Sequence, residues 1–329
     1  MTIRDIATKA GVSVATVSRV LNGQSGYSPD TRDRIMQIIE QTGYSRNDLA
    51  RSLTGKATHS IGVLLPSLTS YFQSDILWGI ETASHSQDLS VIICNTDKNG
   101  SRTLKYLKTL REKRVDGVIF VSEWLRPEYK SGIESLGTPV VLVSTYSPFF
   151  SFPYVKVDDY QASYDAVSYL ISKGHRRVGM LSGAETDLIA GKPRLEGYFA
   201  ALAHNDLEFE HARVAYGDFD YRSGRAAMQA LLSNAPDTTA VFAASDEMAV
   251  GAMQAVYASG MRVPDDISIV GYDDTLLAEM AHPPLTAVHQ PIQKLGSTAV
   301  EMLTSTEERP AGMILQHSIT ERESVLTLK

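Results

Sequence analysis

Beyond residue 60, continuous apolar runs alternate with amphipathic stretches of helical periodicity, and this alternation constrains the fold more than any other feature. The apolar runs predict strands at residues 61–65, 89–94, 117–121, 140–143, 177–181, 240–244 and 267–270. The amphipathic stretches predict helices at residues 73–86, 101–113, 160–173, 194–205, 221–232 and 246–259. Strands that are apolar throughout are typical of parallel sheets covered by helices on both faces. Because these units are too many for one open sheet, we expect two linked α/β lobes.

The first 44 residues follow a different pattern, that of three short helices. We predict these helices at residues 3–10, 14–21 and 29–43. Each follows a residue type that commonly caps helices, namely Thr2, Ser13 and Ser28. Two short helices joined through a glycine turn are typical of a helix-turn-helix, which places the start of its second helix in the major groove of DNA. The alternative is a small three-helix bundle whose arginines are solvated.

The side chains at the start of the second predicted helix suit the reading of bases. Val14 and Ala15 are small and apolar, while Thr16 and Ser18 offer hydroxyl groups. Arg19 is long enough to reach a guanine or a phosphate. This set of residues favours a DNA-binding role for the N-terminal segment.

The distribution of charge agrees with that role. Residues 1–60 carry eight Lys or Arg side chains against five Asp or Glu, a net charge of +3. The whole chain carries −7, so the remaining residues carry −10. A positive segment joined to an acidic body is expected when only one end of a chain meets phosphate.

Residues 12–22, which read VSVATVSRVLN, resemble the headpiece of the LacI/GalR family of bacterial transcription regulators. The resemblance continues through Tyr44 and residues 49–53, reaches the strings 245–251 and 271–274, and spans essentially the whole chain. It implies a helix-turn-helix domain at residues 1–45 that binds double-stranded operator DNA as one half of a homodimer on a near-palindromic site. The residues that it implies in DNA contact are Thr2, Ser13, Val14, Ala15, Thr16, Ser18, Arg19, Asn22, Tyr44, Asn47, Ala50, Arg51 and Leu53.

The resemblance also implies a hinge helix within a linker at residues 46–60. Residues 47–53 are far fewer than the roughly 12 that an isolated helix needs in water, so folding of this segment on DNA is physically sensible. Leu53 matches the leucine that the family inserts between base pairs of the minor groove. Arg46 stands where the family often has proline, a departure that bears on the angle at which the chain enters the hinge. A plain linker is the alternative.

From residue 61 onward the resemblance implies an α/β core like that of periplasmic sugar-binding proteins, with a ligand between two lobes. The implied lobes are residues 61–158 with 291–318, and residues 159–290 with 319–329. Parallel sheets gather ligands at the carboxyl ends of their strands, so the candidate effector residues are sought there. These candidates are Tyr71, Phe72, Ser144, Tyr146, Arg194, Phe219, Ser245, Asp273 and Gln290.

One departure from the family bears on the ligand. After the run at 140–143, many relatives carry an Asp-Arg pair, whereas this chain has Ser144-Thr145 followed by aromatic residues up to Phe152. With Phe72, Trp124 and Phe219 nearby, such rings would form a wide aromatic cleft that favours an oligosaccharide or glycoside through stacking. The alternative is that these rings pack inside the lobe.

Other classes of protein fit the sequence less well. A periplasmic sugar-binding protein would have a signal peptide and no use for residues 1–55. An enzyme would show a nucleophile or phosphate-binding motif, and none is present. We therefore expect a cytoplasmic, dimeric repressor of a carbohydrate-utilisation operon, released by a sugar or glycoside, with no cofactor, metal site or membrane span. A catabolite-control regulator of the same family, acting with a phosphocarrier protein, is the remaining alternative.

Overall fold

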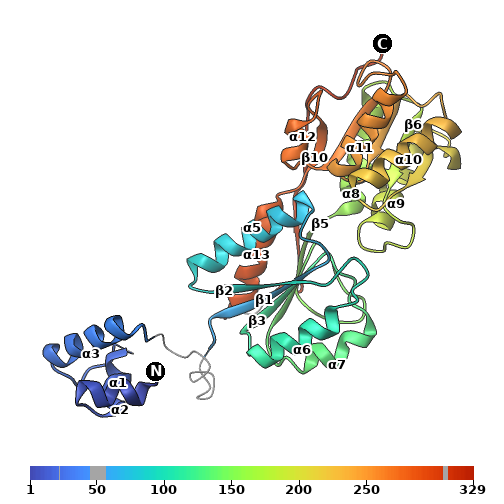
Figure 1. Cartoon of the computed structure of the whole chain (residues 1–329). Helices are drawn as coiled ribbons and strands as arrows, with labels where there is room; N and C mark the ends of the chain where they lie inside the picture. The colour runs from blue at the N-terminus through green and yellow to red at the C-terminus, as the bar shows by residue number, and fades with distance from the viewer. Residues whose placement is uncertain (22, 45–56, 307–309) are drawn as a thin grey trace. The chain divides into compact units, whose positions relative to one another are not determined.

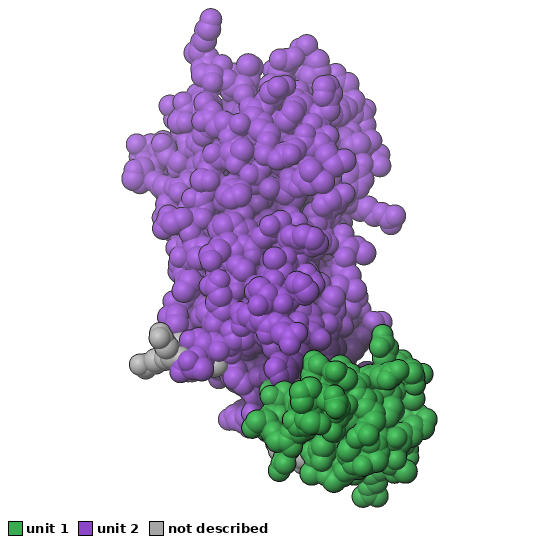
Figure 2. All heavy atoms as spheres, turned by 90° about the vertical axis from the view of Figure 1, so that its left-hand side faces the viewer, with its two compact units in different colours: residues 1–58 green, residues 59–329 purple. Residues whose placement is uncertain are grey.

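The computed structural model describes residues 1–21, 23–44, 57–306 and 310–329. The chain divides into two compact units, residues 1–58 and residues 59–329, which are coloured separately in Figure 2. Five of the predicted DNA-contact residues lie outside the described residues: Asn22, Asn47, Ala50, Arg51 and Leu53.

The first unit contains the three predicted helices, α1 (Ile3–Ala10), α2 (Val14–Leu21) and α3 (Pro29–Thr42). Thr2 begins α1 with a reciprocal capping interaction with Asp5, and Gly11 ends it at a φ of 62°, which glycine adopts without steric cost. The helices enclose a small core of Ile6, Ala7, Ala10, Val17, Val20 and Ile35. The predicted three-helix pattern is confirmed.

The second unit begins with a six-stranded parallel sheet in the order β11-β5-β4-β3-β1-β2. Its strands are β1 (Ser60–Leu65), β2 (Ser90–Asn95), β3 (Gly117–Val121), β4 (Val140–Val143), β5 (Tyr154–Val157) and β11 (Gly312–Leu315). Helices α5 (Tyr71–Ser86) and α13 (Ile292–Thr304) cover one face, and α6 (Thr103–Lys113) and α7 (Lys130–Glu134) cover the other (Figure 1). Both faces of the central strands are buried, as their continuous apolar sequences require. We call this sheet and its helices the N-lobe.

A second six-stranded sheet, in the order β12-β10-β9-β8-β6-β7, forms the C-lobe. Its strands are β6 (Val178–Ser182), β7 (Val214–Tyr216), β8 (Ala240–Ala243), β9 (Ser268–Asp273), β10 (Thr286–His289) and β12 (Ser318–Thr320), of which only β12 runs antiparallel to its neighbour. Its helices are α8 (Asp159–Ser172), α9 (Gly191–His204), α10 (Tyr221–Asn234), α11 (Asp246–Ala258) and α12 (Leu276–Met280). Helices α8 and α9 pack together, as do α10 and α11.

The chain passes between the two lobes three times. It crosses from β5 to α8, from β10 to α13 and from β11 to β12, because β5 and β11 belong to one sheet and β10 and β12 to the other. The predicted arrangement of two linked lobes on parallel sheets is confirmed. No helix in the described part of the chain has both the length and the apolar character that a membrane span requires.

The structure adds strands that the search for apolar runs did not find. In β5, partly exposed and buried residues alternate, and in β11 no residue is fully buried. β7 and β12 have three residues each, which is too short for a pattern to stand out. These strands lie at or next to the edges of the two sheets, where continuous apolar sequence is not needed.

Helices α5 and α13 approach each other closely through small residues. A Cβ atom added at Gly79 of α5 would lie 2.0 Å from the carbonyl oxygen of Gln293 in α13. The backbone of α13 therefore occupies the space that any other side chain would need, and this contact fixes the packing of the N-lobe helices.

We predict that Gly79→Ala destabilises the protein by about 1–3 kcal/mol, the usual cost of overpacking a tight core contact. At a solvent-exposed helix position the same change would stabilise the protein by roughly 1 kcal/mol. The sign of the change in the free energy of unfolding therefore distinguishes the two situations. Urea unfolding followed by circular dichroism measures the effect, and Thr82→Ala, at an exposed position of the same helix, is the control. A stabilised Gly79→Ala variant would contradict the packing described here.

Candidate functional site

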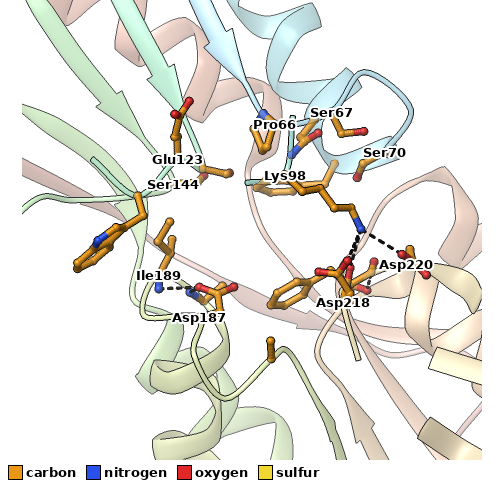
Figure 3. Close-up of a pocket in the computed structure, with 18 of the residues that line it drawn as sticks. Pro66, Ser67, Ser70, Lys98, Glu123, Ser144, Asp187, Ile189, Asp218 and Asp220 are labelled. Atoms are coloured by element: carbon orange, nitrogen blue, oxygen red, sulfur yellow. Dashed lines mark hydrogen bonds and ion pairs between the residues drawn. The ribbon is translucent and has the colours of Figure 1, made fainter. Parts of the chain in front are cut away.

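A cleft of about 610 Å³ lies between the two lobes. It is lined by segments that follow the carboxyl ends of β1, β2, β3 and β4 in the N-lobe and of β6, β7, β8 and β9 in the C-lobe (Figure 3). In parallel sheets this edge is where ligands bind, because the connecting loops meet there while the helices cover the faces. The volume is within the range of small-molecule sites in proteins.

Arg194, near the start of α9, is buried in the wall of this cleft with 6% of its surface exposed. Its Nε and Nη2 atoms donate to Asp159 Oδ1 at 3.0 and 2.9 Å, and Nη1 donates to the carbonyl oxygen of Ala244. The guanidinium also stacks on the ring of Tyr272, 3.6 Å from its centroid. Asp159 in turn accepts from the Tyr272 hydroxyl at 3.2 Å and pairs with Lys156 at 3.1 Å. Arg194 is therefore held rigidly in one position, with few of its donors left for a ligand.

Asp273, at the end of β9, is the buried acceptor of the cleft. It has a φ of 114°, which directs the backbone sharply away from the strand, and its Oδ1 accepts from Gln290 Nε2 at 2.8 Å. Burial raises the pKa of Asp273 to about 7, opposed in part by the charge of Arg194 and by the Gln290 hydrogen bond. Burial also raises the pKa of the neighbouring Asp246 well above its usual range, and the charge of Asp273 adds to this. The two carboxyl groups therefore favour a state in which at least one carries a proton.

Aromatic rings supply flat apolar surface to both walls of the cleft. Phe219, with a φ of 58°, lies over Gly183, where an added Cβ would come within 2.1 Å of the ring. Its ring also lies 5.8 Å from the guanidinium carbon of Arg194. On the N-lobe side, Trp124 lines the cleft and meets Phe149 edge-on at 6.1 Å. Rings of this kind can stack on the apolar faces of a sugar.

An ion-pair group joins the two lobes at this cleft (Figure 3). Lys98, after β2 of the N-lobe, places Nζ 2.6 Å from Asp218 Oδ2 and 3.1 Å from Asp220 Oδ2, both after β7 of the C-lobe. Nearby, the backbone N–H of Tyr71 donates to Glu247 Oε1 at 3.3 Å. Lys98 is not among the cleft residues that the sequence indicates. Its position shortly after the predicted strand at 89–94 is the sequence feature that could have indicated it.

The structure brings seven of the nine candidate effector residues to the cleft: Phe72, Ser144, Arg194, Phe219, Ser245, Asp273 and Gln290. Ser245 is already engaged, because its Oγ accepts from the N–H of Met248 at 3.1 Å and donates to the Phe219 carbonyl at 3.0 Å. Ser144 Oγ is buried without a partner in the described residues. Phe72 lines the cleft and also packs against the N-lobe core. The expected contact with a ligand and the alternative of packing inside the lobe therefore both fit this ring.

Tyr71 and Tyr146 do not line the cleft. The side chain of Tyr71 is exposed, and only its backbone reaches the other lobe. Tyr146 lies against Lys156, whose Nζ is 5.6 Å from its ring centroid, beside a separate shallow hollow. Of the predicted aromatic cluster, Phe150 and Phe152 stack on each other at 5.5 Å and pack against the N-lobe core. Only part of the aromatic sequence therefore bears on a ligand.

In the first unit, helix α2 presents Val14, Ala15 and Arg19 as exposed side chains. Ser13 Oγ accepts from the N–H of Thr16 at 3.1 Å and contacts its hydroxyl at 2.9 Å, so Ser13 caps α2. Among the described residues, Arg19 has no ion-pair partner, which leaves its guanidinium available.

Three more of the predicted DNA-contact residues differ in how far they are exposed in this unit. Thr2 is exposed and caps α1. Ser18 is half-buried. Tyr44 is also half-buried and packs against the small core. Of these three, only Thr2 is fully at the surface.

The carboxyl pair of the cleft makes stability depend on pH. Because the pKa of folded Asp273 lies above the usual 3.8, the folded state holds a proton that the unfolded state loses, and stability falls as pH rises from about 4 to 7. The free energy of unfolding of the unmodified protein should therefore decrease between pH 5 and 7.5. We predict that this decrease is smaller by roughly 1–3 kcal/mol in Asp273→Asn. Thermal unfolding across this range measures it, with Asp88→Asn, at an exposed position, as the control. Equal pH profiles for Asp273→Asn and the unmodified protein would refute the assignment.

The comparisons with known proteins cover both units. Residues 2–47 match the family described as bacterial regulatory proteins, lacI family, and residues 58–323 match periplasmic binding proteins and sugar binding domain of LacI family. The chain is 35% identical to catabolite control protein A of Priestia megaterium over 98% of this chain and 99% of that protein.

Two solved structures extend the comparison. A lac repressor dimer bound to operator and the anti-inducer ONPF is similar with a TM-score of 0.88 and 29% identity, covering 99% of both chains. The complex of the transcriptional regulator CelR with cellobiose is similar with a TM-score of 0.76 and 33% identity, covering 98% of this chain and 99% of that one. With its helix-turn-helix unit and its two-lobed core, the chain belongs to the LacI family of bacterial transcription regulators.

Proposed function

We propose that this protein is a dimeric repressor that binds operator DNA through α2 and is released when a small sugar or glycoside occupies the cleft. The observation that carries the proposal is the presence, in one chain, of a helix with exposed base-reading side chains and of a cleft lined by buried polar groups and aromatic rings. The membership of the LacI family supports the same conclusion.

The DNA-binding step rests on the chemistry of α2. Arg19 is positioned to donate to guanine or to a phosphate, while the small side chains of Val14 and Ala15 allow the helix to approach the base edges. A single unit of three short helices buries too little surface for specific binding, so two subunits on a near-palindromic site are needed. We propose that residues 47–53 form a hinge helix on DNA, with Leu53 inserted in the minor groove.

The effector-binding step rests on the cleft. Asp273 and Gln290 offer acceptors and donors for hydroxyl groups, and Phe219 and Trp124 offer rings for the apolar faces of a sugar. A volume of about 610 Å³ accommodates a disaccharide or a glycoside as well as a single sugar ring. Such a ligand shifts DNA binding only if it prefers the state of the lobes that binds DNA poorly.

A second candidate is a regulator of the catabolite-control type, which would act with a phosphocarrier protein. The identity of 35% with catabolite control protein A is compatible with this candidate, and an equal identity with the ribose operon repressor of Escherichia coli is compatible with the first. The two candidates share the DNA-binding step and differ in whether a sugar alone changes operator affinity.

We predict that Arg19→Ala weakens operator binding by roughly 5- to 150-fold, because a good base contact contributes about 1–3 kcal/mol of discrimination. Fluorescence anisotropy with a labelled promoter fragment measures the loss, and raising the salt concentration should weaken binding by the unmodified protein steeply. Arg32→Ala, an exposed arginine on α3 that pairs with Asp33, is the matched control. Unchanged affinity for Arg19→Ala would argue against α2 as the reading helix.

We also predict that Phe219→Leu lowers the affinity for the releasing sugar about tenfold and leaves operator affinity unchanged. The substitution removes the stacking ring, and both residues share the same cost of a positive φ. Titration of the protein–promoter complex with sugars measures release, and Tyr216→Leu, an exposed ring outside the cleft lining, is the control. Release at the same sugar concentration in both variants would sink the assignment of Phe219.

A further inference from the structure

Carboxyl groups outnumber cationic side chains in the lining of the cleft. Within the described residues, three cationic side chains line it: Lys98, Arg126 and Arg194. Eight carboxylate side chains line it: Asp97, Glu123, Asp159, Asp187, Asp218, Asp220, Glu247 and Asp273. Burial raises the pKa values of Glu123, Glu247 and Asp273. Two further carboxylates are paired with cations that lie outside the lining, Asp97 with Arg102 at 2.8 Å and Asp159 with Lys156 at 3.1 Å.

Each cation of the cleft is already committed to protein oxygens. Lys98 pairs with both Asp218 and Asp220. Arg194 uses three of its five N–H donors on Asp159 and on the carbonyl oxygen of Ala244. Arg126 Nη2 donates to the carbonyl oxygen of Asn99 at 2.7 Å, and its Nη1 lies 3.5 Å from Glu128. An anion entering the cleft would have to displace these partners.

Several carboxylates, in contrast, have no cationic partner among the described residues. Asp187 Oδ1 accepts only from the backbone N–H groups of Ile189 and Ala190, at 2.8 and 3.2 Å (Figure 3). Glu247 accepts from a backbone N–H. Asp273 accepts from an uncharged amide. These carboxylates lie after β6, at the start of α11 and at the end of β9, so three separate segments of the C-lobe offer acceptors to the cleft.

From these committed cations and unpaired carboxylates we propose that the cleft selects an uncharged polyhydroxyl ligand and rejects its phosphorylated and carboxylic acid counterparts. Hydroxyl groups donate to the unpaired carboxylates, whereas a phosphate or a sugar acid would meet like charge and no free cation. The inference rests on the proposed function, since it names the chemical class of effector for the same cleft. The proposal distinguishes a free sugar from a phosphosugar as the effector of this protein.

Calorimetric titration of the full chain without DNA tests this proposal. The probes are ribose, glucose, galactose, maltose and cellobiose, together with ribose 5-phosphate, glucose 6-phosphate, gluconate and inorganic phosphate. The expected result is binding of at least one neutral sugar and at least tenfold weaker binding of every anion. An anion that binds as tightly as its neutral counterpart overturns the proposal, and so does a panel in which no neutral sugar binds. Because DNA is absent, either failure leaves the promoter-binding result with Arg19→Ala untouched.

A charge-neutral variant tests the cause. The double substitution Asp218→Asn with Asp220→Asn removes two negative charges and frees Lys98, while asparagine at 220 can still cap α10 through Ser223. We expect the double substitution to lower the ratio of the affinities for neutral sugar and sugar phosphate about tenfold. Lys98→Gln, which removes the cation instead, should not lower this ratio. An unchanged preference in the double variant would show that the carboxylates are not its origin.

Discussion

The buried ion pair between Arg194 and Asp159 is the interaction on which the cleft depends. Taking two charges out of water is costly, and the cost is recovered only because Tyr272, Lys156 and the carbonyl oxygen of Ala244 complete the network. Lys156 is the penultimate residue of β5, the last N-lobe strand before the first crossover, and Asp159 begins the first C-lobe helix. The same network that fixes the arginine in the cleft wall therefore fixes the point where the chain first passes between lobes. Loss of Asp159 would leave Arg194 and Lys156 without their shared counter-charge, whereas loss of Arg194 would leave Asp159 paired with Lys156 alone.

The other two crossovers are held in a comparable way. Asp273 accepts from Gln290, which begins the second crossover, and the adjacent Asp274 pairs with His289 at 3.0 Å. Asp274 also accepts from Thr320 at 2.7 Å and from Arg322 at 2.6 Å, which follow the third crossover. Consecutive carboxylates at the end of β9 thus hold both segments. A ligand that bonds to Asp273 acts on a residue directly joined to a crossover, and this is a physical route from occupancy to lobe geometry.

The sequence predicted those parts of the molecule whose pattern is local. Continuous apolar runs located the central strands except β10, whose four residues include a threonine and a histidine, and cap residues located the first three helices. Short or half-exposed strands such as β5 and β11 escaped, because burial there is partial. In the site, the resemblance indicated Arg194, Phe219 and Asp273, which line the cleft. It could not indicate Lys98, since its pairing with Asp218 joins residues 120 positions apart and depends on how the lobes meet.

The contrast between the crossovers and the cleft rim limits how the lobes can move. The carboxylates of the crossover contacts, Asp159, Asp273 and Asp274, are buried. The side chains of Lys98, Asp218 and Asp220 are instead 55%, 60% and 42% exposed. Exposed pairs of this kind contribute only about 0.2–1 kcal/mol each. Opening the cleft therefore breaks the rim pair at small cost while the crossovers stay intact. A ligand that binds only one state of the lobes stabilises that state by about 2.7 kcal/mol when its concentration is about 100 times its Kd. Occupancy of the cleft, rather than the ion pair at its rim, then sets the balance between open and closed lobes.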